Sequence, residues 1–343
     1  MRKIYILLFV FILIGFIIDL MTGSVAIPVQ EIIRILWSGE SDNQAWFYII
    51  DKIRLPKALT AILVGCGLSV GGLQMQTLFR NPLAGPSELG ITAGASLGVA
   101  AMMLSGTGAA GVAAIHQLGV SGSWAVSVMA SLGAALVFMI VILIAGRLKD
   151  HVVMLIVGVM ISTLTMSLIS IWQYFSQPEQ LQAYIFWTFG SLGGVRDAQL
   201  LVLAIIVTAG ILLAFVSSKA LNTLLLGEDY AQSMGLTIGR ARLMILLSTS
   251  LLTGSITAFC GPVGFVGIAV PHIARSLVNT SDHRILIPAT CLIGALVMLV
   301  CDILTQLPGF QAVLPINVVT ALFGAPVVIW IIISRNNLRS SFL

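Results

Sequence analysis

Residues 198–216 read AQLLVLAIIVTAGILLAFV, a run with no charged side chain. A helix of about 20 apolar residues is long enough to cross the hydrocarbon core of a bilayer, so this run is predicted to span a membrane. Similar runs recur along the chain, separated by clusters of glycine, proline and charge. They predict an all-α polytopic membrane protein with about ten transmembrane helices, at 4–22, 57–78, 88–105, 119–146, 151–173, 198–216, 238–259, 263–279, 284–305 and 314–334.

The composition supports the same class of protein. Of 343 residues, 58% are hydrophobic and 9% are charged, and the mean hydropathy is +1.07. About ten spans consume nearly all the apolar residues, so we expect one transmembrane domain over residues 1–343 and no separate soluble catalytic domain. The net charge of +4 does not indicate nucleic-acid binding, because the basic residues occur singly or in pairs rather than in a patch.

The basic residues predict the orientation. With a cytoplasmic N-terminus, the inner segments carry twelve of them: Arg2, Lys3, Arg80, Arg147, Lys149, Lys219, Arg240, Arg242, Arg275, Arg284, Arg335 and Arg339. The outer segments carry five: Arg34, Lys52, Arg54, Lys57 and Arg196. This excess obeys the positive-inside rule. We therefore expect a protein of the cell (inner) membrane with both termini cytoplasmic, a first span retained as a signal anchor, and an external loop from Gly23 to Pro56.

Small residues repeat at helical spacing within the predicted spans. Gly90, Gly94 and Gly98 recur at every fourth position, as do Gly67 and Gly71, and such stripes allow close approach of helices in lipid. Residues 94–98 also match the G-x-S-x-G pattern of serine hydrolases. That pattern requires a strand before the serine, so an intramembrane hydrolase built on Ser96 is only a remote alternative.

Several catalytic signatures are missing from the sequence. None of the five lysines lies in a G-x-x-x-x-G-K-[ST] loop, which would cradle a nucleotide phosphate. The cysteines lie in apolar runs without C-x-x-C spacing and are interpreted as packing residues: Cys66, Cys260, Cys291 and Cys301. The histidines are interpreted as interfacial or capping residues rather than metal ligands: His116, His151, His272 and His283. We expect no metal, no cofactor and no enzymatic activity.

Acidic residues within the apolar zone would indicate ion coupling. Only Asp19 and Asp302 fall within it, both towards the outer face. We interpret them as snorkelling side chains or as hydrogen-bond partners of helix ends. An ion relay would therefore have few groups to use, and the energy for uphill transport is expected to come from another chain.

The longest cytoplasmic insertion, residues 219–242, reads KALNTLLLGEDYAQSMGLTIGRAR. It predicts a short helix ending at Leu226, a stop at Gly227, and a second helix beginning with the acids Glu228 and Asp229. Met234-Gly235 provides the next stop. Two short helices joined by glycine beneath the membrane would form a lever.

Several motifs, in order along the chain, resemble those of one transporter family. They are Arg54-Leu55-Pro56-Lys57, Gln76 with Arg80-Asn81-Pro82-Leu83-Ala84-Gly85-Pro86, Leu89-Gly90, Gly94-Ala95, Leu226-Gly227-Glu228 with Ala231 and Met234-Gly235, Gly261-Pro262 through Pro271-His272, Ala274-Arg275, and Pro315 with Gly324-Ala325-Pro326. The chain thus resembles, over essentially its whole length, the permeases of the ABC importers for iron siderophores, haem and vitamin B12 (FecCD-type, type II importers).

The resemblance implies the partners of the chain. A permease of this family pairs with a second copy or a paralogue, sits on two cytoplasmic ABC ATPase subunits and receives its cargo from an extracytoplasmic substrate-binding protein.

The resemblance also implies site residues. The residues that it implies for coupling to the ATPase are Leu221, Leu226, Gly227, Glu228, Asp229, Ala231, Met234 and Gly235. The cytoplasmic gate falls on Asn81 and Leu83, which should face His151 and Val152 across the dimer axis. Docking of the binding protein falls on Arg54 and Lys57, with Gln306 standing where relatives carry a second arginine.

The function expected from these features is that of a permease moving a metal chelate into the cytoplasm. A ferric siderophore is the favoured cargo; haem and vitamin B12 stay open, and a secondary transporter is the alternative class. An uncharged polar lining is expected on the fifth span, from Ser162, Thr163, Thr165, Met166, Ser167 and Ser170. These hydroxyls could equally bond to carbonyls of their own helix.

Overall fold

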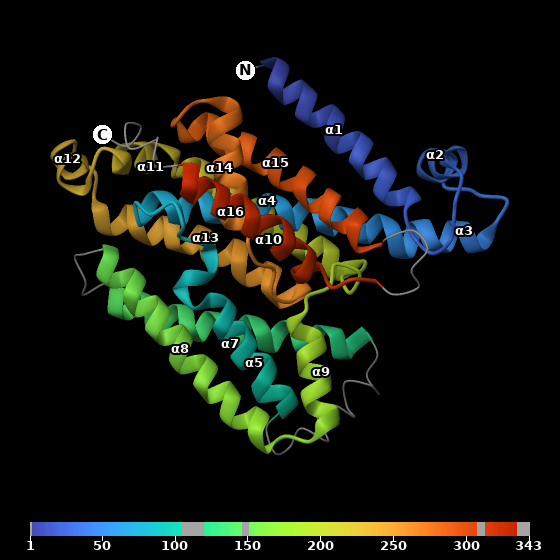
Figure 1. The fold of residues 1–343 in the computed structure, drawn as a ribbon, viewed down its shortest axis with the longest axis horizontal. Helices are drawn as coiled ribbons and strands as arrows, with labels where there is room; N and C mark the ends of the chain where they lie inside the picture. The colour runs from blue at the N-terminus through green and yellow to red at the C-terminus, as the bar shows by residue number, and fades with distance from the viewer. Residues whose placement is uncertain (1, 105–119, 146–150, 307–312, 335–343) are drawn as a thin grey trace.

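The computed structural model describes residues 2–104, 120–145, 151–306 and 313–334. The described residues fold into helices and connecting turns, with no strand among them (Figure 1). The long helices are α1 (Arg2–Met21), α4 (Leu55–Leu78), α5 (Ile91–Leu104), α7 (Val120–Ala145), α8 (His151–Phe175), α10 (Ala198–Val216), α13 (Ile238–Cys260), α14 (Val266–Val278), α15 (His283–Thr305) and α16 (Ile316–Ser334).

These helices confirm the predicted polytopic fold. In the part of the chain that the structure describes, seven helices are long and apolar enough to cross a membrane, and α5, α14 and α16 are shorter apolar helices. Each predicted span coincides with one of these ten elements. Parts of two expected connections lie outside the described residues, including His116, Arg147 and Lys149, as do Arg335 and Arg339 near the C-terminus.

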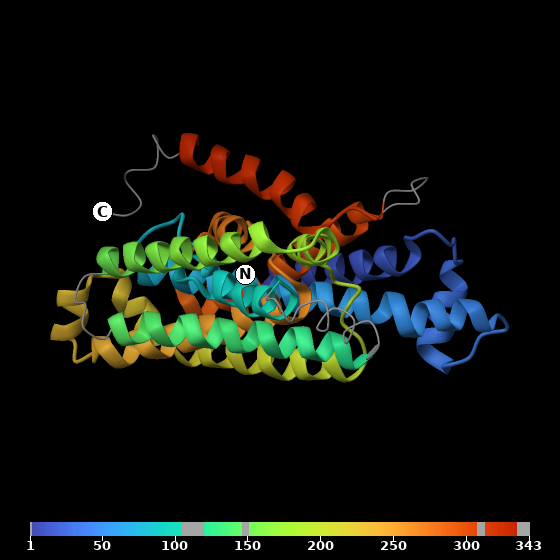
Figure 2. The ribbon, with the colours of Figure 1, turned by 90° about the horizontal axis from the view of Figure 1, so that it is seen from below.

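Helices α4, α13 and α15 run roughly along the long axis of the molecule, whereas α1, α5 and α8 cross it obliquely (Figures 1 and 2). We name the two ends of the bundle by the short helices found there. The α3 end carries α3 (Gln44–Ile49), the start of α4 and the end of α15; the α12 end carries α12 (Glu228–Ser233), the end of α4 and the start of α15. Helices α4 and α15 therefore connect the two ends directly.

The segment expected as a long loop, from Gly23 to Pro56, is instead largely helical. It forms α2 (Val29–Ser38), α3 and a π-helical turn, η1 (Ile50–Arg54), which continues into α4. Helix α2 buries Ile32 and Ile35 on one face, and the Asn43 side chain caps α3 by accepting from the amides of Ala45 and Trp46. In Figure 2 this segment extends beyond the end of α1. The loop prediction was wrong because short amphipathic helices lack a long apolar run.

A short helix in the second half of the chain was also not predicted. Helix α9 (Pro178–Thr188) lies between α8 and α10, begins with a proline and has a capping box formed by Gln177 and Gln180. Its first turn thus holds the N-terminal signals that favour helix initiation.

The glycine stripe on α5 makes the predicted close helix contact. A Cβ atom added to Gly94 would lie 2.6 Å from the carbonyl oxygen of Gly133 on α7, and one added to Gly98 would overlap the carbonyl of Met129. The stripe on α4 behaves differently: Gly71 has ordinary contacts, and the close neighbour of a Cβ on Gly67 would be the end of the Ile256 side chain rather than backbone. Backbone therefore limits the spacing of α5 and α7.

The tightest contacts of α4 involve glycines that the sequence pattern did not single out. A Cβ on Gly65 would overlap the carbonyl of Gly294 on α15, and a Cβ on Gly72 would overlap the carbonyl of Gly267 on α14. Helix α4 is thus fixed to both neighbours by direct backbone contact.

The hydrolase alternative fails on the local structure. Ser96 lies within α5, follows no strand and is 5% exposed. A nucleophile elbow requires an exposed serine at a turn between strand and helix, so this glycine–serine pattern is a packing feature.

Candidate functional site

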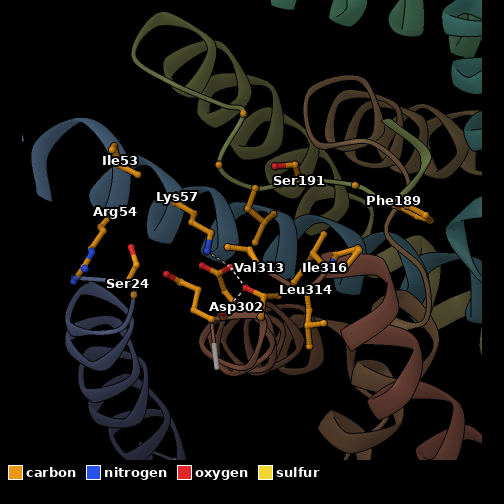
Figure 3. Close-up of a pocket in the computed structure, with 18 of the residues that line it drawn as sticks. Ser24, Ile53, Arg54, Lys57, Phe189, Ser191, Asp302, Val313, Leu314 and Ile316 are labelled. Atoms are coloured by element: carbon orange, nitrogen blue, oxygen red, sulfur yellow. Dashed lines mark hydrogen bonds and ion pairs between the residues drawn. The ribbon is translucent and has the colours of Figure 1, made fainter. Parts of the chain in front are cut away.

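A cavity of about 1070 Å³ opens at the α3 end (Figure 3). Four parts of the chain line it: the segment after α1, the start of α4, the glycine-rich segment after α9, and the end of α15 with the residues that precede α16. Lys57 and Asp302 point toward each other in this cavity. Charge and open volume thus coincide at this end of the bundle.

Lys57 and Asp302 form an ion pair between α4 and α15. The Lys57 Nζ atom lies 2.8 Å from Asp302 Oδ1, and the Asp302 side chain is fully buried. With its amide oriented to suit these neighbours, Gln306 accepts from Lys57 Nζ at 2.9 Å and donates to the Thr22 carbonyl at 3.3 Å. Asp302 Oδ1 also accepts from Thr305 Oγ1 at 3.3 Å. Two of the three N–H donors of the ammonium therefore have partners inside the chain.

Arg54 is likewise used internally. Its guanidinium donates to the carbonyls of Leu20, Met21 and Val25, and the residue is 6% exposed. These bonds satisfy carbonyls at the end of α1 that have no partner within the helix. Arg54 thus joins α1 to α4, and Lys57 joins α4 to α15. Their expected role in docking a binding protein stays a prediction.

The two aspartates of the apolar zone do not snorkel as expected. Asp19 is 3% exposed and Asp302 is 0% exposed, and the two carboxyl groups are neighbours where α1 packs on α15. The sequence offered one signal that was not used. Asp19, Lys57 and Asp302 all fall near the same end of predicted spans, where unpaired charges are costly and tend to find one another.

At the α12 end, the expected pair of short helices is present. Helix α11 (Ser218–Leu225) is followed by Gly227 at φ 108°, and α12 is followed by Gly235 at φ 86°. Both angles lie in the region that glycine adopts without strain. The glycine pattern therefore identified both chain reversals correctly.

The α11–α12 segment is anchored by buried residues and displays exposed ones. Leu221 and Ala231 are fully buried, whereas Leu226, Tyr230 and Met234 are 60%, 56% and 62% exposed. A set of apolar side chains held out by a rigid support indicates a surface for a partner protein.

The acids of this segment differ from each other. Glu228 pairs with Arg242 of α13 at 3.1 Å, whereas Asp229 is exposed. Glu228 therefore helps to hold α12 against the bundle, and Asp229 faces solvent.

A polar network that the sequence did not suggest ties α11 to the bundle. Asn222 Oδ1 accepts from the His283 amide at 2.8 Å and lies 2.7 Å from His283 Nδ1. His283 Nε2 lies 2.8 Å from Thr77 Oγ1 at the end of α4. The Asn222 amide donates to Asp282 at 2.7 Å. These contacts connect α11 to both α4 and α15.

Asp282 is the charged member of that network, and it caps α15. The hydrogen bond from Asn222, together with the Arg284 amide, holds the pKa of Asp282 below its usual range. The sequence signal was an aspartate directly before a span, the usual N-cap position, but its partner 60 residues away could not be read from the pattern.

The residues expected at a gate lie on two separate elements. Asn81 Oδ1 accepts from the Leu83 amide at 3.0 Å, and His272 Nε2 lies 2.8 Å from the Pro82 carbonyl, so this turn is firmly held. Leu83 is 40% exposed and Val152 is 50% exposed. His151 begins α8. Within the chain, α8 packs on α5 and on η2 (Pro86–Leu89).

The hydroxyls expected to line a pathway bond to their own helix. Five side chains each donate to the carbonyl four residues earlier: Ser162, Thr163, Thr165, Ser167 and Ser170. Thr165 is buried, whereas Thr163, Met166 and Ser170 are exposed. The α8 surface is therefore uncharged, with its hydroxyl protons already used.

Comparison with known proteins identifies the family. The FecCD transport family matches residues 11–334. The hemin transport system permease protein HmuU of Yersinia pestis is 34% identical over 310 residues, covering 90% of this chain and 89% of that protein. The vitamin B12 import system permease protein BtuC of Klebsiella pneumoniae is 38% identical over 282 residues, covering 82% of this chain and 81% of that protein.

A solved structure shows the same architecture. A metal-chelate type ABC transporter in an inward-facing conformation superposes with a TM-score of 0.81 at 28% identity, covering 97% of this chain and 100% of that chain. The match thus extends over the whole bundle, including both ends described above. The chain belongs to the FecCD transport family and is a multi-span permease subunit of an ABC importer, a transport component without its own nucleotide-binding site.

Proposed function

We propose that this permease moves a metal chelate into the cytoplasm, driven by separate ABC ATPase subunits, and that the cargo is a ferric siderophore. The related proteins are described as transporting haem, vitamin B12 or a metal chelate, so haem and vitamin B12 are the competing cargoes. The ion-coupled alternative has little support, because Asp19, Lys57 and Asp302 are engaged with one another near one end of the bundle.

The main observation that supports coupling to an ATPase is the group of exposed apolar side chains on α12 and its flanks. Leu226, Tyr230 and Met234 project from a segment that Leu221 and Ala231 anchor in the bundle. An ATPase surface that covers these side chains would move α11, and the contacts of Asn222 would pass that movement to α4 and α15. Under this proposal the α12 end is cytoplasmic, as are both termini, in the cell (inner) membrane.

The exposed face of α8 supports a pathway between two copies of the chain. Large apolar side chains such as Ile156, Met160 and Leu164 are more than half exposed on it, which is excessive for a helix inside a single bundle but suits an interface or a lipid-facing surface. In a homodimer, or a dimer with a paralogue, Leu83 and Val152 would meet across the axis and close the cytoplasmic side. The hydroxyls of α8 would give the passage a surface without charge.

The binding protein is proposed to dock at the α3 end, around the mouth of the cavity. Because Arg54 and Lys57 are engaged inside the chain, and Gln306 with them, these three residues would shape the docking surface rather than contact the partner by charge. The exposed cations at this end are Arg34, Lys52 and Arg196, and charges of this kind mainly accelerate encounter.

The coupling proposal is tested by two changes in the α11–α12 segment. Gly227→Pro removes the backbone geometry of the joint, since proline cannot adopt φ 108°. Glu228→Lys with Asp229→Lys reverses the charge at the start of α12. We expect both variants to insert normally in the membrane but to lose ATPase association or cargo-stimulated ATP hydrolysis.

The matched control is Glu40→Lys, a charge reversal at an exposed site of the α3 end. It should leave ATPase association unchanged. Normal association and normal stimulated hydrolysis in both α12 variants would remove this segment from the coupling function. The cargo is tested separately, by measuring the affinity of the cognate binding protein for a ferric siderophore, haem and cobalamin; tightest binding of haem or cobalamin would overturn the siderophore assignment.

A further inference from the structure

The two buried aspartates at the α3 end present an unusual balance of charge. Asp302 is 0% exposed and Asp19 is 3% exposed, and the two carboxyl groups are neighbours where α15 packs on α1. A carboxylate can only accept hydrogen bonds, so two ionised carboxylates cannot bond to each other. Two neighbouring carboxylates in a desolvated site also repel each other, which opposes the ionisation of both.

The hydrogen-bond partners of the two carboxyl groups also indicate that they are not both ionised. Asp302 Oδ1 accepts hydrogen bonds from Lys57 and Thr305. Asp302 Oδ2 and Asp19 Oδ1 are buried and have no donor among the residues that the structure describes. A single proton between the two carboxyl groups would satisfy both of these oxygens at once.

The other ionisable groups around the pair do not replace that proton. Lys57 of α4 is bound to Asp302 and Gln306, and Arg54 of η1 donates to the carbonyls of Leu20, Met21 and Val25. Cys301, the neighbour of Asp302 on α15, is a buried free thiol. Lys57 therefore pairs with Asp302, whereas Arg54 acts on Asp19 only through its charge, because its hydrogen bonds go to backbone carbonyls.

We propose that Asp19 and Asp302 form a proton-binding site, in which Asp19 is neutral and its O–H donates to the Asp302 carboxylate. With Lys57 they make a neutral set of three groups, which we call the proton latch, joining α1, α4 and α15. Lys57 and Asp302 line the cavity, so water in the cavity can accept the proton when it leaves. Its loss would leave two ionised carboxylates next to each other in a desolvated site and weaken the attachment of α1.

The latch depends on none of the partner proteins proposed above, so it is tested on the purified full-length permease. The thermal unfolding midpoint of the wild type should fall as the pH is raised from about 6 to about 9, because the folded state then holds one proton more than the unfolded state. Asp19→Asn replaces the neutral carboxyl by an amide that can donate the same hydrogen bond. This variant should have the wild-type unfolding midpoint at low pH, and its midpoint should no longer fall as the pH is raised. Asp42→Asn changes an exposed carboxylate at the same end and should keep the pH dependence of the wild type.

Infrared spectroscopy provides a readout that a purely structural role would not move. Glu88 is another partly buried carboxyl, so the spectra are compared in a Glu88→Gln background. We expect a protonated-carboxyl C=O band that shifts in D2O, disappears at high pH and is absent from the Asp19→Asn variant. If that variant does not fold, the pH difference spectrum of the Glu88→Gln protein decides alone.

Three results would overturn the latch. They are the absence of a protonated-carboxyl band, a pH profile of Asp19→Asn that parallels the wild type, and a midpoint that depends at fixed pH on sodium in the wild type but not in Asp19→Asn. The last result would assign the site to a metal cation instead of a proton.

Discussion

At the α3 end, helices α4 and α15 are joined by charge, whereas at the α12 end the same two helices are joined by neutral hydrogen bonds. The first junction is the buried pair of Lys57 and Asp302; the second is the contact of Thr77 with His283, extended by Asn222 to α11. Desolvated charges are strongly destabilising when one partner is lost, while a lost neutral hydrogen bond costs much less. The α3 end should therefore be stiff, and the α12 end should be able to move.

The two ends are also expected to respond oppositely to pH. At the α3 end, raising the pH would remove the shared proton and weaken the junction. At the α12 end, the pKa of Asp282 is held below its usual range by Asn222, so its contribution is present above the ordinary aspartate pKa and is lost as the pH falls through the lowered value. This second contribution is small, because Asp282 is largely in contact with solvent and screening weakens it.

The largest effect is expected from Asp302→Asn. This change leaves the Lys57 ammonium without its carboxylate in a buried site and should destabilise the protein by about 3–5 kcal/mol. The unfolding free energy of the purified chain measures the loss. The double variant Lys57→Met, Asp302→Asn should lose less than Asp302→Asn alone, since no uncompensated charge is left. Equal losses in the single and double variants would show that charge does not hold this end together.

An intermediate effect is expected midway between the ends, from Gly65→Ala. The added methyl group would overlap the carbonyl of Gly294, with the Ala295 amide nitrogen 2.9 Å away, so α4 and α15 must separate. We expect a destabilisation of about 1–3 kcal/mol, measured by thermal or chemical unfolding. Gly239→Ala is the matched control, because a Cβ at that helical position has nothing within 4 Å. It should be neutral or stabilising by up to about 1 kcal/mol, and a loss as large as that of Gly65→Ala would contradict the contact.

The smallest effect on stability is expected from Asn222→Ala, at about 1–2 kcal/mol for hydrogen bonds that water partly replaces. Its effect on function should be larger, because α11 loses its connection to α4 and α15. Stimulated ATP hydrolysis in the assembled importer should fall while ATPase association is kept. Thr223→Ala, which removes only a bond to the carbonyl of Lys219 on the same helix, serves as the control. Full stimulation in Asn222→Ala would show that the network does not transmit movement.

Most of the fold could be predicted from the sequence, because hydrophobic runs identify spans regardless of their neighbours. The glycine-punctuated pair α11 and α12 could be predicted as well, since Gly227 and Gly235 act on the local backbone. The helices α2, α3 and α9 could not, because their apolar faces are short and are recognised only against the bundle. The site was the least predictable part: Arg54 and Lys57 look like rim charges in the sequence, and only the arrangement of α1, α4 and α15 shows that Arg54 is buried and that Lys57 is part-buried and paired with Asp302.

The central claim, that this permease is driven by a separate ATPase, is tested most directly by cargo uptake into proteoliposomes. The permease is reconstituted with its cognate ATPase subunits and binding protein, and uptake of the ferric siderophore is measured with ATP, without ATP, and with only a proton or sodium gradient. The account predicts uptake with ATP and none with the gradients alone. Accumulation driven by an ion gradient, by the permease without its ATPase, would contradict it.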